Sequence, residues 1–114
     1  MKNPAERGKF EGSMKYNKLV RDRIPEIIKQ NNSTPIIHIA DDEEYWDKLK
    51  EKLKEEIDEF FKNSTEEELA DILEVIYAFR DYMKIDKDKF EEIREKKAQK
   101  RGSFKKKIIL DETK

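Results

Sequence analysis

The sequence predicts an all-α protein, a helical bundle built on a central antiparallel helix hairpin. Apolar residues recur at intervals of three and four through two long segments, about 42–62 and 65–83, as in amphipathic helices. A capping box opens the first segment at Asp41 and Glu44, and a second one, either Thr65 with Glu68 or Ser64 with Glu67, opens the next segment. The break between the segments, residues 63–65, is short enough to favour helices that run antiparallel.

The composition excludes several classes of protein. Charged residues make up 46% of the 114 residues and hydrophobic residues only 35%, so a stable core requires the apolar residues to gather on defined helix faces. The lack of cysteine excludes disulfides, thiol catalysis and cysteine-based metal sites. Because no apolar run approaches the roughly 18 residues of a membrane span and no signal-peptide core is visible, we expect a cytoplasmic protein without a membrane partner.

The first residues differ from the rest of the chain. Residues 1–13 have no hydrophobic periodicity and end in Gly-Ser before a second methionine, Met14. We therefore interpret 1–13 as an expression tag or linker and 14–114 as one domain.

Two shorter helices flank the central pair. Pro25 fits the first turn of a helix that ends near residue 30, with Ile24 and neighbouring isoleucines on its buried face. A last helix begins at Asp86 or Asp88, turns Phe90 and Ile93 inward, and stops at Gly102. Either aspartate suits an N-cap, so the sequence leaves its first residue open.

Two runs read as short strands. The β-branched run 35–40 and the run 105–110 could pair into one small two-stranded piece. We expect His38, within the first run, to pack structurally rather than act in catalysis.

One helical segment predicts an oligomer. Residues 72–79 (ILEVIYAF) are apolar on nearly every side, which implies burial all round. Because a domain of this size has few helices to cover such a segment, we expect a homo-oligomer, with a dimer through 65–83 favoured.

The central helices each carry an acidic pair at i, i+3. Glu56 and Glu59 precede the break, and Glu68 and Asp71 follow it at matching distances. In an antiparallel hairpin, all four carboxylates would lie at matching heights and could hold Mg²⁺ or Mn²⁺. The alternative is a salt-bridged surface, since Lys52 lies four residues before Glu56.

The charges are unevenly distributed. Residues 41–74 contain 15 acidic and 5 basic residues, whereas 15–23 contain 4 basic and 1 acidic, and 84–114 contain 12 basic and 7 acidic. An acidic centre between two basic ends suits a site that holds a cation and a polyanion together. A solvated protein that is merely uneven in charge is the alternative.

Three blocks of sequence resemble one known family. The acidic pairs on either side of a short turn are similar to the MazG-like all-α nucleoside triphosphate pyrophosphohydrolases. The opening YNKLVRDRIPEII (16–28) and the closing RGSF…KKIIL (101–110) resemble the phosphoribosyl-ATP pyrophosphohydrolase-like branch. The departures are a short segment between the acidic pairs and Ser103 where a second glycine would be expected.

The resemblance implies an activity. Glu56, Glu59, Glu68 and Asp71 would hold Mg²⁺ and act in the hydrolysis of a nucleoside triphosphate, or of a phosphoribosyl-ATP-like substrate, to a monophosphate and pyrophosphate. Such an enzyme could serve nucleotide-pool house-cleaning. Basic side chains from both ends would bind the phosphates, namely Lys18, Arg21, Arg23, Lys97 and Arg101.

A function of another class competes with this one. Residues 94–107 contain 8 Lys or Arg in 14 positions, which could serve a non-catalytic helical module that binds nucleic acid or protein. The acidic centre would repel nucleic acid, so we do not expect a nucleic-acid partner.

Overall fold

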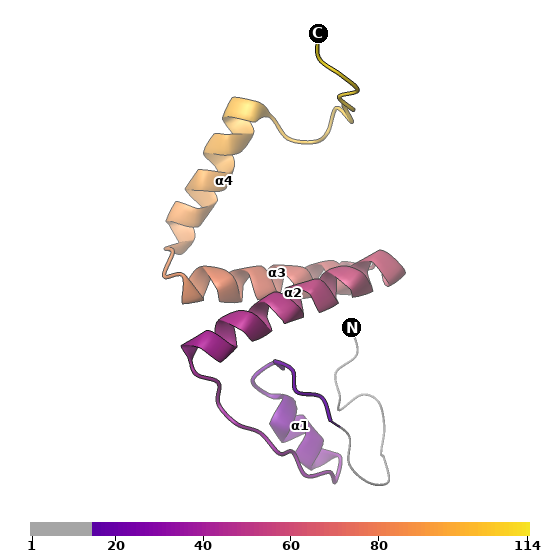
Figure 1. Cartoon of the computed structure of the whole chain (residues 1–114), viewed down its shortest axis with the longest axis vertical. Helices are drawn as coiled ribbons and strands as arrows, with labels where there is room; N and C mark the ends of the chain where they lie inside the picture. The colour runs from indigo at the N-terminus through magenta and orange to yellow at the C-terminus, as the bar shows by residue number, and fades with distance from the viewer. Residues whose placement is uncertain (1–14) are drawn as a thin grey trace. The chain divides into compact units, whose positions relative to one another are not determined.

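The computed structural model describes residues 15–114, and this part of the chain is all-helical, with four helices joined by irregular segments (Figure 1). The tag predicted over 1–13 and the start predicted at Met14 lie outside the described residues. The chain divides into two compact units at the boundary between Phe79 and Arg80, within the third helix.

Helix α1 spans Ile24–Gln30 and has Pro25 in its first turn, as the sequence predicts. Ile24 is 2% exposed. The helix ends at Asn31, and Asn32 follows with a φ of 62°, a left-handed conformation that asparagine tolerates better than most residues.

Helix α2 spans Asp42–Asn63. The Asp41 side chain accepts a hydrogen bond from the Glu44 backbone N–H at 2.9 Å, which confirms the predicted N-cap. Leu49 is completely buried, in the middle of the apolar stripe. The helix ends at Ser64, a left-handed residue whose N–H donates to the carbonyl of Phe60.

Helix α3 spans Glu66–Tyr82. The Thr65 hydroxyl accepts a hydrogen bond from the Glu68 N–H at 3.2 Å, so the second capping box begins at Thr65. Near the far end of α3, Phe79 meets Trp46 of α2 edge to face, with ring centroids 5.3 Å apart. Trp46 and Phe79 therefore lie against each other, although they are far apart in sequence. They stand at similar distances along the chain from the connection at Ser64 and Thr65.

The two predicted strands are wrong for the described part of the chain, which contains no strand. In the first run Ile36 is 96% exposed and Ile39 is 89% exposed, and in the second Ile108 is 77% exposed. β-branched composition favours an extended backbone, but a strand needs a paired neighbour. The packing expected of His38 is also wrong, because its side chain is exposed and its Nε2 lies 2.8 Å from Glu44 Oε1.

The single chain does not bury residues 72–79 on all sides, so the predicted burial by a second copy stays a prediction. Val75 is buried, whereas Leu73 and Tyr77 are 47% and 38% exposed. Leu69, one turn before Leu73, is 55% exposed. Three apolar side chains at intervals of four therefore form an exposed stripe on α3.

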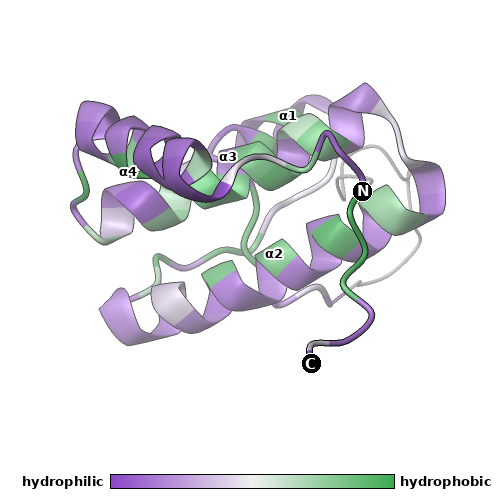
Figure 2. Cartoon of the chain, turned by 90° about the horizontal axis from the view of Figure 1, so that it is seen from above, coloured by the Kyte–Doolittle hydropathy of each residue, from purple (hydrophilic) through white to green (hydrophobic). Residues whose placement is uncertain are grey.

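The second unit contains helix α4, which spans Lys87–Arg101 and is coloured mainly hydrophilic in Figure 2. Asp86 is its N-cap, accepting from two backbone N–H groups, and Gly102 ends it with a φ of 86°. Phe90 is partly buried, but the inward position predicted for Ile93 is wrong, since this side chain is 52% exposed. Ion pairs along its surface, such as Lys96 to Glu92 at 2.7 Å, replace a continuous apolar face.

Along residues 15–114, no helix combines the length and the apolar character needed to cross a membrane.

Candidate functional site

Three of the four predicted carboxylates converge. Glu56 of α2 and Glu68 and Asp71 of α3 each offer an oxygen, and these three atoms lie within 4.8 Å of one another. The capped connection between the helices positions them, because it brings the first turns of α3 beside the second half of α2. Carboxylates this close repel one another unless a proton or a cation lies between them.

Glu56 is the most unusual member of this cluster. Its side chain is 3% exposed, and its Oε2 atom is buried without a hydrogen-bond partner. Burial raises the pKa of Glu56 and the charge of Asp71 adds to this effect, against the opposing pull of Lys52. A buried carboxylate oxygen with no donor is the kind of atom that a hard cation satisfies.

Lys52 is part of this site, although the sequence offered it only as a sign of a salt-bridged surface. It is 8% exposed, and its Nζ lies 3.4 Å from Glu56 Oε1 and 3.4 Å from Glu55 Oε2. The i, i+4 spacing of Lys52 and Glu56 predicts that the two side chains can pair. The sequence does not show that both side chains are buried.

Glu55 lies between two lysines, and it pairs with both Lys18 and Lys52. Its Oε1 accepts a hydrogen bond from Lys18 Nζ at 2.8 Å. Burial acts to raise the pKa of Glu55, but the hydrogen bond from Lys18 and the charge of Lys52 outweigh it, and the pKa is lowered. The pKa values of these two neighbouring glutamates are therefore shifted in opposite directions, down for Glu55 and up for Glu56.

The segment before α1 is fastened to both long helices by basic side chains. Lys48 Nζ donates to the carbonyl of Asn17 at 2.7 Å, and Lys18 pairs with Glu55 on the same helix. Arg21 Nη2 lies 2.7 Å from Asp71 Oδ1 on α3. Of the predicted phosphate-binding residues, Arg21 thus contacts a member of the carboxylate cluster, and Lys18 contacts Glu55, the residue before Glu56 in the chain.

The other predicted site residues lie elsewhere. Glu59 is partly exposed on α2 and is not one of the three clustered carboxylates. Arg23 pairs locally with Glu26 at 3.2 Å. Lys97 and Arg101 are exposed on α4 in the second unit, so their role toward the cluster stays a prediction.

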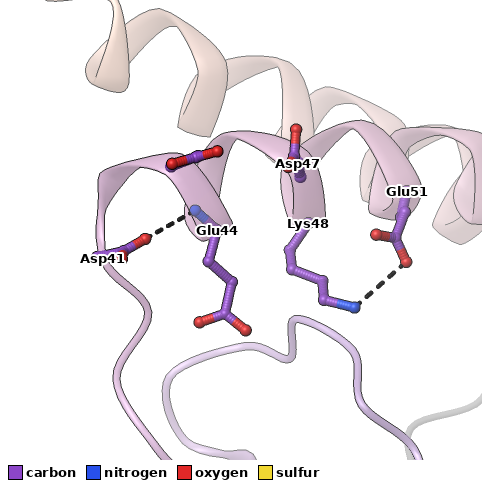
Figure 3. Close-up of a pocket in the computed structure, with 6 residues that line it drawn as sticks. Asp41, Glu44, Asp47, Lys48 and Glu51 are labelled. Atoms are coloured by element: carbon purple, nitrogen blue, oxygen red, sulfur yellow. Dashed lines mark hydrogen bonds and ion pairs between the residues drawn. The ribbon is translucent and has the colours of Figure 1, made fainter.

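A separate hollow of about 460 Å³ lies at the start of α2 (Figure 3). All of its lining residues come from one stretch of chain: Asp41, Glu43, Glu44, Asp47, Lys48 and Glu51. Because a single helix end forms it, the hollow is a charged exposed surface rather than a cleft between elements. It contains no member of the carboxylate cluster.

The donor set fits a divalent cation. Glu56, Glu68 and Asp71 supply only carboxylate oxygens, the ligands that Mg²⁺ and Mn²⁺ prefer. Exposed acidic groups often gather without a metal, but here one member is buried with an unsatisfied oxygen. The geometry is therefore that of a candidate metal centre.

Comparison with known proteins finds one partial relative. A protein of Mycolicibacterium smegmatis (strain ATCC 700084 / mc(2)155), described as uncharacterized, is 54% identical to this chain over 41 residues. The similar stretch covers 36% of this chain and 42% of the relative, so the chain matches less than half of that protein's length. No protein-family model and no solved structure matches the chain.

Proposed function

We propose that this protein is a Mg²⁺-dependent nucleotide pyrophosphohydrolase that acts in the cytoplasm. It cleaves a nucleoside triphosphate, or a phosphoribosyl-ATP-like substrate, between the α and β phosphates. The products are a monophosphate and pyrophosphate. The substrate class follows from the resemblance of the three sequence blocks, and the observation that carries the proposal is the buried, unsatisfied oxygen of Glu56 beside Glu68 and Asp71.

In this proposal α2 and α3 form the antiparallel hairpin that holds the cation. Glu56, Glu68 and Asp71 are its ligands, and Glu59 is the fourth, carried over from the sequence pattern. A cation bound there would offset charge on the phosphate oxygens and lower the pKa of a water molecule. The water oxygen would form a bond to the α phosphorus and lose its proton to solvent, while the bond to the bridging oxygen breaks and pyrophosphate leaves with that oxygen.

The chain's own residues prepare this reaction. Lys52 balances the charge of Glu56 and Glu55 inside the helix pair and so holds their carboxylates in place. Lys18 and Arg21 place positive charge where the phosphate chain would lie, beside the acidic ligands. Arg23, Lys97 and Arg101 complete the phosphate site in this proposal.

The functional unit is a homodimer formed through α3. The exposed stripe of Leu69, Leu73 and Tyr77 supports this part of the proposal, because contiguous exposed apolar side chains on a helix favour a packed partner. Since the same helix carries Glu68 and Asp71, a partner on α3 would also support the ligand positions.

A second candidate function is a non-catalytic module that binds nucleic acid or protein through its basic C-terminal segment. One observation favours it: in that segment Phe104 is 98% exposed beside Lys105, Lys106 and Lys107, which are all exposed. Affinity for single-stranded or duplex nucleic acid that falls steeply with salt, without pyrophosphate release, would support this function instead.

The test is pyrophosphate release from a panel of nucleotides, with Mg²⁺ or with EDTA. We expect activity with Mg²⁺ only, and its near-abolition by Glu56→Gln and by Asp71→Asn. The matched control is Asp58→Asn on the same helix, because Asp58 is exposed and pairs with Lys54 at 3.6 Å. Full activity in both site variants, or no activity with any nucleotide tried, would contradict the proposal.

A further inference from the structure

We propose that the guanidinium of Arg21 competes with the divalent cation for the carboxylate of Asp71, so that cation binding turns Arg21 toward the phosphate chain. This inference rests on the proposed function. It adds a positioning role for Arg21 that couples the metal centre to the substrate.

The first step is the contact itself. Arg21 Nη2 lies 2.7 Å from Asp71 Oδ1, the length of a charge-assisted hydrogen bond. Asp71 is also one of the three clustered carboxylates, so a cation held there and the guanidinium would draw on the same side chain. Two positive groups at one carboxylate repel each other, so each weakens the binding of the other.

The second step is freedom of movement. The Arg21 side chain is 52% exposed, so it can turn away from Asp71 without first breaking the core. Its backbone is held: the Arg21 carbonyl accepts from the Ile24 N–H at 3.0 Å, and Lys18 is anchored to Glu55. The guanidinium can therefore change partner while the segment that carries it stays in place.

The third step is the new partner. A guanidinium released beside a bound cation is hydrated by water, and an anion that lies between the two charges binds it more favourably. A phosphate chain supplies such an anion, and arginine can bind it with two parallel donors. In the absence of the cation, Asp71 thus keeps Arg21 close to the proposed nucleotide site. When the cation binds Asp71, the guanidinium is released and can bind the phosphates.

The experiment titrates each protein with MgCl₂ alone and measures binding by calorimetry and by the rise in unfolding temperature. The variants are Arg21→Ala, Arg21→Lys and the control Lys54→Ala. The control removes one positive charge from an exposed i, i+4 pair on α2, and so measures the general effect of net charge. We expect Arg21→Ala to bind Mg²⁺ about fivefold more tightly than the wild type, at the lower end of the range typical of coupled sites. Arg21→Lys should lie near the wild type and Lys54→Ala within about twofold of it.

A second titration uses a non-hydrolysable nucleoside triphosphate analogue at saturating Mg²⁺. Here Arg21→Ala should bind roughly tenfold more weakly than the wild type, because a charge-assisted hydrogen bond is lost. The opposite signs of the two effects distinguish competition from a loss of fold.

Should Arg21→Ala fail to fold, Arg21→Gln takes its place in both titrations. If the wild type binds Mg²⁺ and Arg21→Ala binds it equally well or more weakly, the proposed competition is wrong, but the proposed metal site is not contradicted. No Mg²⁺ binding by any of these proteins would remove the metal site and this inference together.

Discussion

Glu56 lies in surroundings that disfavour the charged form of its carboxyl group. Its pKa is raised, chiefly by burial and further by Asp71, although Lys52 lies 3.4 Å away. In EDTA, we expect Glu56→Gln to change the free energy of unfolding by no more than about 1 kcal/mol, because the amide keeps the shape and the relief of repulsion from Asp71 offsets the loss of the ion pair with Lys52. The measurement is thermal unfolding of the wild type and the variant at pH 8.

The same variant should lose its response to Mg²⁺. At a free Mg²⁺ concentration about 100 times the dissociation constant, binding stabilises the wild type by about 2.7 kcal/mol. Glu56→Gln should gain little, and Asp58→Asn should behave as the wild type. A Glu56→Gln variant that still gains as much stability from Mg²⁺ as the wild type would contradict the assignment of Glu56 as a ligand.

At the residue scale, spacing predicted which carboxylates meet but not their surroundings. Equal distances from the break placed Glu56 opposite Asp71, and the structure brings these two together with Glu68. Spacing placed Glu59 with them as well, but the height of a Cα does not fix the direction of a long side chain. The burial of Lys52 depends on packing from other elements, which the pattern of one helix does not contain.

At the scale of elements, local signals were sufficient for the helices. Asp41 caps its helix as the sequence predicts, and Thr65 and Asp86 are each one of the two caps that the sequence left open. Such signals are local because a cap is a contact between residues two or three apart. The runs 35–40 and 105–110 failed as strands because pairing depends on a partner, and composition does not supply one.

Helix α4 should depend strongly on its cap. It has no buried residue, and Asp86 Oδ2 accepts from the N–H groups of Asp88 and Lys89 at 3.0 and 3.1 Å. We expect Asp86→Ala to cost about 1 kcal/mol of local stability, the usual loss for an N-cap. Hydrogen exchange of the first-turn amides of α4 measures it. Asp86→Asn, which keeps the acceptor, should exchange as the wild type; equal protection in all three proteins would show that the cap is dispensable.

At the scale of the whole molecule, the charge distribution leads to a prediction about the second unit. In the proposed function Lys97 and Arg101 on α4 bind phosphate, although they belong to a different unit from the carboxylates. The double variant Lys97→Ala/Arg101→Ala should raise KM roughly tenfold or more, because charge-assisted bonds to phosphate are lost. Its unfolding temperature should change little, since both side chains are exposed.

The control for this prediction is Lys89→Ala/Lys114→Ala, which removes the same charge from exposed positions outside 94–107. Steady-state kinetics of both double variants make the comparison. An equal rise in KM would show that only net charge matters, and no rise in either would exclude Lys97 and Arg101 from the substrate site.

The exposed stripe on α3 predicts how the molecule assembles. Residues 72–79 are too apolar for a surface helix, yet Leu69, Leu73 and Tyr77 stay 55%, 47% and 38% exposed in the single chain. If α3 packs against a second copy, Leu73→Lys would bury an unpaired charge in that interface, at a cost of several kcal/mol. We therefore expect sedimentation at micromolar concentration to show a dimer for the wild type and a monomer for Leu73→Lys. Glu74→Lys changes the charge at the neighbouring exposed position and should remain a dimer. A monomeric wild type, or a dimer that Leu73→Lys leaves intact, would mean that α3 meets some other partner or none.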